Sequence, residues 1–232
     1  MKIADMTWMQ VEEYLERDDR CVVPLGCTEQ HAYLSLATDN ILAERVAIEA
    51  AEPLGIPVFP VVTYGITPLF MDYPGTVSIS TETFERLLLE ILGSVRRHGF
   101  KRITVVNGHG GNSPVRAAAQ AWSERRDGVE LRWHDWWSAP RVRAAIDAID
   151  PDASHASWME SFPWTRVGGV EVPEGHKSPP PRAKGEKWSP ARFRELIGDG
   201  SFGGYYERPD EEMLRLWQIA LEETREVLAE GW

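Results

Sequence analysis

Short apolar runs alternate with amphipathic segments along most of this sequence, and that alternation limits the folds open to the chain. Strand-like runs occupy residues 21–26, 56–65, 101–107 and 129–137, and the second contains Pro60. Apolar residues at helical spacing occupy about 7–17, 41–51, 81–98, 113–128, 139–149 and 209–229. Strands separated by helices are typical of a mainly parallel sheet with helices on both faces. We therefore expect an α/β fold.

Capping residues predict where several of these helices begin and end. Thr7, with a glutamine three residues later, has the pattern of a capping box. Ser80 or Thr81 can cap the helix that Gly99 ends. Ser113, with a proline directly after it, predicts the start of the following helix.

The length of the chain and the distribution of its prolines and glycines indicate its domain organisation. A sequence of 232 residues can form one sizeable domain with a substantial core. It shows no internal repeat and no linker-like stretch, so we expect a single domain over residues 1–232. Prolines and glycines are dense between about 151 and 208, and this stretch is predicted to form ordered loops that cover a site or join subunits. Several tryptophans cluster from Trp133 to Trp164, which suggests a pocket wall or a subunit interface.

Composition and local pattern disfavour several classes of partner. The formal charge of −11 argues against nucleic acid, because phosphate binding needs clustered Lys and Arg. No apolar run approaches the roughly 18 residues that cross a bilayer, and the first residues lack a signal-peptide pattern. Cys21 and Cys27 are too few for a disulfide framework and flank a predicted strand, so both are expected to be reduced. We therefore expect a cytoplasmic protein that binds neither nucleic acid nor membranes.

Acidic and imidazole side chains gather where predicted strands end. Glu29 and His31 follow the first strand two residues apart, so in extended chain both point to the same side. Asp39 stands at the entrance of the next helix, and His109 lies in the glycine-rich loop after the third strand. Ligands of open parallel sheets bind beyond the carboxyl ends of the strands, so these loops are expected to meet at one rim. Oxygen and nitrogen ligands of this kind suit Zn, Mn or Fe(II).

Each of these residues also has an ordinary structural interpretation. Alone, Asp39 is a typical acid at a helix N-terminus, and a single histidine is more often a hydrogen-bonded core residue. The loop at 107–112 could cradle phosphate, but it lacks the third glycine of a dinucleotide fingerprint and the lysine of a P-loop. Gly110 and Gly111 are instead expected to let a substrate or metal approach the backbone. The convergence of several such residues favours the metal site.

A further pair of candidate residues lies in the segment SHASWMESFPWT. His155 and Glu160 are five residues apart among small and aromatic neighbours. Alone, Glu160 could be a solvated helix acid. In the functional interpretation Glu160 is another metal ligand or an acid–base group, and His155 donates or accepts a proton near the site.

Four blocks of this sequence resemble the creatininase (creatinine amidohydrolase) family, and they occur in the family's order. The blocks lie within residues 21–160 and read PLGCTEQHAYLSLATD, YPGT, NGHGGN and HASWME. The resemblance implies a three-layer α/β/α sandwich that holds two divalent metal ions (Zn, Mn or Fe), with Asp39 bridging the pair. The residues that match ligand positions of the family are Glu29, His31, Asp39, His109 and Glu160. Family members are often hexamers, so the resemblance also implies a homo-oligomer.

The resemblance implies a hydrolase that opens a small polar cyclic substrate, a cyclic amide or a cyclic ketone, by attack of a metal-bound hydroxide on a carbonyl. His155 and Glu160 are its candidate catalytic residues. The sequence lacks the family's second histidine between His31 and Asp39 and has Gly111 where creatininase has an acid, which argues against creatinine. The ending ESFPWTR resembles the branch with 3-dehydro-scyllo-inosose hydrolase, which would imply C–C cleavage. A peptide-trimming family member and a non-catalytic small-molecule binder are the alternatives.

Overall fold

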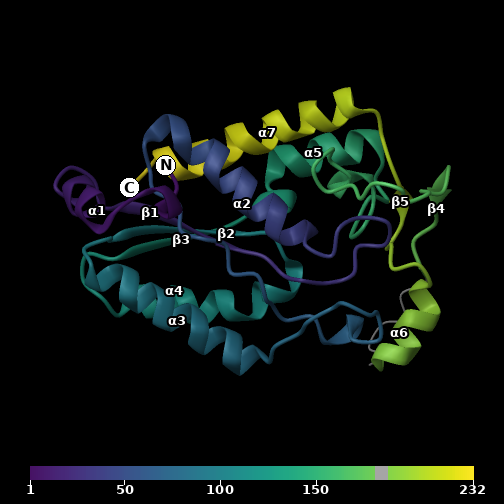
Figure 1. Cartoon of the computed structure of the whole chain (residues 1–232), viewed down its shortest axis with the longest axis horizontal. Helices are drawn as coiled ribbons and strands as arrows, with labels where there is room; N and C mark the ends of the chain where they lie inside the picture. Colours follow the sequence, from purple (N-terminus) through teal and green to yellow (C-terminus); the bar gives the residue numbers. More distant parts are fainter. Residues whose placement is uncertain (181–187) are drawn as a thin grey trace.

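A computed structural model of the chain describes residues 1–180 and 188–232, and a parallel sheet lies at its centre (Figure 1). Within those residues the sheet runs in the order β1 (Arg20–Leu25), β2 (Arg102–Asn107) and β3 (Glu130–Asp135). Leu25 pairs with Asn107, and Asn107 pairs with Asp135, so the three strands end level with one another. Every loop that leaves a carboxyl end of the sheet therefore starts from the same edge.

Helices cover both faces of this sheet, which confirms the predicted α/β/α layering (Figure 1). One face carries α2 (Thr38–Ala51), α5 (Pro140–Ile149) and α7 (Asp210–Ala229), and the other carries α3 (Thr81–Arg97) and α4 (Arg116–Glu124). Strand side chains alternate between the two layers. Val22 and Val106 are buried in the cluster with α2 and α7, whereas Val23 and Val105 are buried in the cluster with α3.

Two of the predicted helix caps are confirmed, and the third is wrong. Thr7 and Gln10 form a capping box at α1 (Trp8–Leu15), and the Ser80 side chain accepts a hydrogen bond from the Thr83 N–H at the start of α3. Ser113 caps no helix, because residues Gly110–Val115 form a 3-10 turn and α4 begins only at Arg116. The side chain of Asn112 donates to the Gly26 carbonyl and holds this turn against the end of β1.

The strand predicted at 56–65 is wrong as a continuous element. This segment runs beside β1, but among the described residues it makes only isolated parallel bridges, which include Val58 with Val22 and Val62 with Leu25. Proline has no N–H to donate to a ladder, and Pro57 and Pro60 interrupt the pairing.

The stretch from 151 to 208 holds more regular structure than its proline and glycine content predicts. It contains the 3-10 turn Trp158–Glu160, the helix α6 (Pro190–Ile197) and the antiparallel strands β4 (His176–Lys177) and β5 (Gly204–Tyr205). Ser189 caps α6 by accepting a hydrogen bond from the Arg192 N–H. The proline- and lysine-bearing residues 181–187, part of the predicted cover, lie outside the described residues. The lid or interface role of this stretch stays a prediction.

Most of the tryptophan cluster contributes to the core. Trp136 and Trp158 are fully buried, and Trp136 packs at 5.9 Å from Trp217 of α7, measured between ring centroids. Trp137 lines the pocket described below. Cys21 and Cys27 are both unpaired, as expected. Among the described residues, no helix combines the length and the apolar character needed to cross a bilayer.

Candidate metal centre

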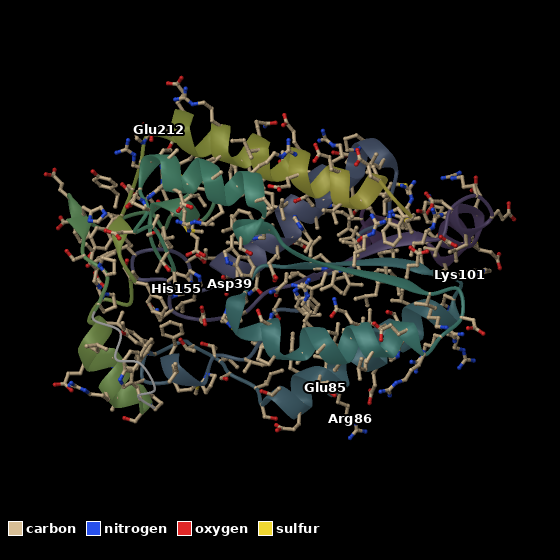
Figure 2. The ribbon with its side chains drawn as sticks, turned by 180° about the vertical axis from the view of Figure 1, so that it is seen from behind. Asp39, Glu85, Arg86, Lys101, His155 and Glu212 are labelled. Carbon is tan, nitrogen blue, oxygen red and sulfur yellow. The ribbon has the colours of Figure 1, made fainter. Side chains whose placement is uncertain are left out.

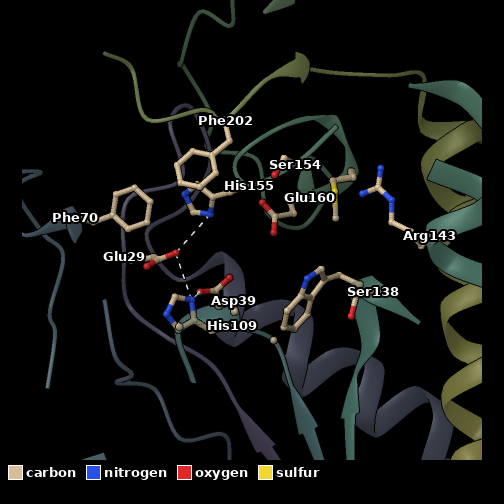
Figure 3. Close-up of a pocket in the computed structure, with 15 residues that line it drawn as sticks. Glu29, Asp39, Phe70, His109, Ser138, Arg143, Ser154, His155, Glu160 and Phe202 are labelled. Carbon is tan, nitrogen blue, oxygen red and sulfur yellow. Dashed lines mark ion pairs between the residues drawn. The ribbon is translucent and has the colours of Figure 1, made fainter. Parts of the chain in front are cut away.

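The predicted ligands converge beyond the carboxyl ends of the strands. Glu29 and His31 lie in the loop after β1, and Asp39 lies in the first turn of α2. His109 follows β2, and Glu160 ends the 3-10 turn after α5. Figure 2 shows Asp39 and His155 near this end of the sheet, and Figure 3 shows the carboxylates and rings facing a common space.

Asp39 lies between two histidines. Its Oδ1 is 3.0 Å from Nε2 of His31, and its Oδ2 is 3.0 Å from Nδ1 of His109. Glu29 Oε1 lies 3.4 Å from the same nitrogen of His109, and Glu160 Oε2 lies 3.8 Å from the same nitrogen of His31. Glu29 and His109 therefore form one group, His31 and Glu160 form a second, and Asp39 contacts a histidine of each.

Backbone carbonyl groups fix how both histidines present their nitrogens. Nδ1–H of His31 donates to the Glu29 carbonyl oxygen at 3.2 Å, and Nε2–H of His109 donates to the Ile66 carbonyl oxygen at 3.0 Å. Because a carbonyl oxygen only accepts, each ring keeps its proton on the outer side and turns its other nitrogen toward the carboxylates. This arrangement is typical of histidines that ligate metal.

The buried charges shift each other's pKa values strongly. Burial alone would lower the pKa of His31, but Asp39 and then Glu160 raise it to about 10. Burial would likewise lower the pKa of His109, and the charge of Glu29 and the contact with Asp39 raise it well above its usual value. Burial would raise the pKa of Asp39, yet His31 and His109 lower it. Without metal, the rings therefore carry the positive charge that balances the carboxylates.

Buried polar atoms that make no well-formed hydrogen bond show that this site fits divalent metal. Glu29 Oε2, His31 Nε2 and Asp39 Oδ2 are buried, and none makes a hydrogen bond of acceptable geometry within the described residues. A buried polar atom without a partner is costly, and a cation would satisfy all three. Three overlapping sets of residues each offer ligand atoms that lie within 4.8 Å of one another. They are Cys27, Glu29, Asp39 and His109; His31, Asp39 and Glu160; and Glu29, His31 and His155. The donor chemistry suits Zn, Mn or Fe(II).

The glycines of the loop after β2 make room for protein atoms. A Cβ on Gly111 would lie 2.0 Å from the Ile66 carbonyl oxygen and 2.3 Å from His109 Nε2, the two atoms of the hydrogen bond that orients His109. A Cβ on Gly108 would lie 2.6 Å from the Asp39 carbonyl oxygen. The small size of Gly111 therefore lets the ring of His109 dock against Ile66. Gly110 and Gly111 also line the pocket, so the expectation that they let a substrate or metal approach the backbone stays a prediction.

Backbone strain accompanies two of the histidines. Ala32 directly follows His31 and has φ of 50°, and Ala156 directly follows His155 and has φ of 54°. Non-glycine residues with positive φ are uncommon and cluster at functional sites. The Ala156 N–H donates to Glu160 Oε2 at 2.7 Å, so this turn places the carboxylate.

His155 lies in the wall of the pocket above the carboxylates. Its Nδ1 is 3.5 Å from Glu29 Oε1, and its ring stacks on Phe70 with ring centroids 4.8 Å apart. Phe202 contacts the same ring at 4.9 Å between centroids. The Gln30 side chain reaches His155 Nε2 at 2.9 Å and also donates to the Gly200 carbonyl. The ring is therefore held from several sides.

The pocket encloses about 400 Å³ and combines the carboxylates with an aromatic wall and one arginine. Phe70, Trp137 and Phe202 supply the aromatic surface, and Arg143 of α5 lines the far side beside Ser154 (Figure 3). Gln30 and Arg143 were not predicted from the sequence as site residues. The position of Gln30 between two ligands was the available signal, whereas nothing in the helix 139–149 marks Arg143 as a pocket residue.

Similarity to known proteins agrees with this geometry. A family model described as Creatininase: Creatinine amidohydrolase matches residues 4–228. A Mycolicibacterium smegmatis protein named mycofactocin precursor peptide peptidase is 42% identical over 141 residues, 58% of this chain and 53% of its own. The 3-dehydro-scyllo-inosose hydrolase of Thermotoga maritima is 32% identical over 107 residues, 45% of this chain and 34% of its own. This chain thus spans about half, or less, of the length of these relatives.

Solved creatininases share the fold. A crystal structure of creatinine amidohydrolase (creatininase) has a TM-score of 0.84 at 19% identity and covers 99% of this chain and 98% of its own. A creatininase structure designated Mn has a TM-score of 0.83 at 20% identity over 99% of both chains. A mutant creatininase of Zn–Zn type has a TM-score of 0.82 at 20% identity over 99% of this chain and 98% of its own. Because the family model spans nearly the whole sequence and the fold agrees, the chain belongs to the creatininase family.

Proposed function

We propose that this protein is a metal-dependent hydrolase with two divalent ions bound around Asp39. Glu29 and His109 would hold one ion, His31 and Glu160 would hold the other, and Asp39 would give one oxygen to each. The observation that supports this proposal is the position of Asp39, whose two oxygens each lie 3.0 Å from a different histidine. Solved relatives of Mn and Zn–Zn type favour Mn or Zn, and Fe(II) suits the same ligands.

Divalent ions bound there would generate a nucleophile from water near neutral pH and polarise the carbonyl group of a substrate. The chain's own residues would then move the protons. Burial and the nearby ring of His31 lower the pKa of His155 to about 4, so this ring is neutral at pH 7 and can accept a proton. In the metal-free site burial raises the pKa of Glu160 to about 7, and a bound cation would keep this carboxylate deprotonated as a ligand. In this proposal His155 takes a proton from the attacking water and returns it to the leaving atom.

The shape of the pocket supports a small polar substrate with a flat carbonyl-bearing part. Phe70 and Phe202 flank His155, and Trp137 also lines the pocket. A cyclic amide or a cyclic ketone such as an inosose would fit about 400 Å³ with the carbonyl toward Asp39. Hydrolysis would break a C–N bond in the first case and a C–C bond in the second.

Two observations favour a second candidate, the trimming of a peptide. The relative named mycofactocin precursor peptide peptidase is 42% identical over 141 residues, a higher identity than the inosose hydrolase shows. Arg143 also lines the pocket and carries five N–H donors, of which Asp147 and the Ala153 carbonyl engage three among the described residues. The two remaining N–H groups suit a carboxylate, which the end of a peptide would supply.

A metal analysis followed by a substrate panel tests this function. Protein purified without chelators is analysed for bound metal, then loaded with Mn or Zn and given cyclic amides, inososes and short peptides. About two equivalents of metal and a product heavier by one water support the proposal, and the product distinguishes C–N from C–C cleavage. Protein that binds these compounds without metal and without turnover would be a non-catalytic binder.

We also propose that the protein acts in the cytoplasm as a homo-oligomer, with a hexamer as the expected form. The proposal rests on the family resemblance and on the unpaired state of both cysteines. Light scattering on the full chain measures the mass of the assembly directly.

A further inference from the structure

Cys27 directly borders the candidate metal centre. Its side chain is fully buried, and its Sγ lies within 4.8 Å of ligand atoms of Glu29, Asp39 and His109. Cys21, the other cysteine, belongs to the apolar cluster with α3, whereas Cys27 belongs to none of the apolar clusters of the described residues. The two thiols therefore occupy different chemical environments, although both are buried.

The neighbours of Cys27 point to a ligand. Glu29 Oε2 and Asp39 Oδ2 are buried and make no hydrogen bond of acceptable geometry, and both residues belong to the set that includes Cys27. A thiol that only filled space would face apolar side chains, as Cys21 does. Cys27 instead faces two carboxylates and an imidazole nitrogen, the groups that bind a divalent ion.

We propose that Cys27 is a sulfur ligand for the ion held by Glu29, Asp39 and His109, and that it makes this position selective for thiophilic metals. On binding, the S–H bond breaks, the sulfur–metal bond forms, and the proton leaves to the buffer. The proposal rests on the metal site of the proposed function, but not on hydrolysis.

The two positions of the centre would then differ in metal preference. The set of His31, Asp39 and Glu160 offers only nitrogen and oxygen, which Mn accepts readily. The set with Cys27 adds a soft donor that favours Zn or Co over Mn. A mixed centre, with Zn beside Cys27 and Mn beside His31, would be the preferred state when both metals are present.

Absorption of the cobalt-loaded protein tests the sulfur ligand directly. Co(II) bound to a thiolate has an intense near-ultraviolet charge-transfer band that cobalt bound only by nitrogen and oxygen lacks. Wild-type protein should show the band, Cys27→Ser should lose it, and the matched control Cys21→Ser should keep it. An unchanged band in Cys27→Ser would overturn the proposal. In competition between Zn and Mn, Cys27→Ser should also lose about 10-fold or more of its preference for Zn.

X-ray absorption at the zinc edge of the wild-type protein needs no variant, so it applies even if Cys27→Ser fails to fold. A sulfur scatterer at about 2.3 Å supports the proposal, and a shell of nitrogen and oxygen alone overturns it. Protein that binds no metal at all would overturn the proposed function as well. Protein that binds metal through nitrogen and oxygen alone would overturn only the role of Cys27.

Discussion

Nδ1 of His155 lies 3.5 Å from Oε1 of Glu29. The two residues come from distant parts of the sequence, since His155 lies 125 positions after Gln30, the neighbour of Glu29. The contact joins the loop after β1 to the turn after α5. It places a neutral imidazole beside the carboxylates. His155 is in neither of the two sets that meet at Asp39, but it forms a third set of candidate ligands with Glu29 and His31. A side chain that accepts a proton next to a metal centre must lie close to the reacting atoms and be held in place by the fold.

Asp39→Asn should remove metal from both positions, because the amide keeps the shape of the side chain but cannot bridge two cations. The loss of affinity should exceed the ~10–100-fold that loss of an outer hydrogen-bond partner costs, and turnover should fall with it. Metal content after dialysis measures the effect. Full occupancy and normal turnover in this variant would contradict the bridging role.

His155→Ala should keep bound metal and lose about 10²–10⁴-fold in kcat, the usual size of general acid–base help. In the proposed function the ring lies beside the ligands and carries the proton, whereas Asp39 and its neighbours hold the ions. Metal analysis and kcat are measured on the same preparation. If the variant instead lost its metal, His155 would be a ligand.

The metal-free protein should lose stability as the pH rises from 6.5 to about 10. His31 has its pKa raised from 6.5 to about 10, so the folded state holds the proton more tightly than the unfolded chain. The resulting stabilisation is fully present below pH 6.5 and is lost as the pH rises toward 10. His109 shifts in the same direction. Denaturant midpoints measured from pH 6.5 to about 10 in a chelating buffer show how stability falls with pH. His31→Gln should make this dependence on pH weaker.

Arg143→Met should weaken activity on substrates that carry a carboxylate and spare neutral cyclic ones. Loss of a charge-assisted hydrogen bond of this kind is worth about 1.5–3 kcal/mol, or roughly 10–150-fold in kcat/KM. Arg141→Met, on the same helix but paired with Glu226 of α7, is the matched control. An equal loss on charged and neutral substrates would remove Arg143 from substrate recognition.

Ala32→Gly should leave the protein as stable as wild type or slightly more stable. Ala32 has φ of 50°, a backbone conformation that costs an alanine about 1–2 kcal/mol of conformational energy and costs a glycine little. The greater freedom of glycine in the unfolded chain offsets about 0.5–1 kcal/mol of that gain. By comparison, Ala144→Gly, at an exposed position inside α5, should lower the free energy of unfolding by about 1 kcal/mol. A larger loss at Ala32 than at Ala144 in thermal unfolding would show that Ala32 is not strained.

Much of the fold follows from local sequence. The capping box at Thr7, the cap at Ser80 and the alternation of strands with helices all depend on neighbours within a few residues. The errors arose where distant contacts outweigh local pattern. Asn112 bonds to Gly26 and keeps residues Gly110–Val115 out of the α-helix that Ser113 predicts, and Pro60 reduces an apolar run to isolated bridges.

The sequence by itself determined that Glu29, His31, Asp39 and His109 would lie near one rim, because parallel strands end at the same edge and their loops follow directly. Only the tertiary structure decided which oxygen of Asp39 faces which histidine, that Gly111 makes room for the ring of His109, and that Cys27 and Arg143 reach the site. The physical reason is that side-chain direction and burial depend on packing between segments far apart in the chain. A periodic pattern places an element, but contacts between elements set the distances at which chemistry occurs.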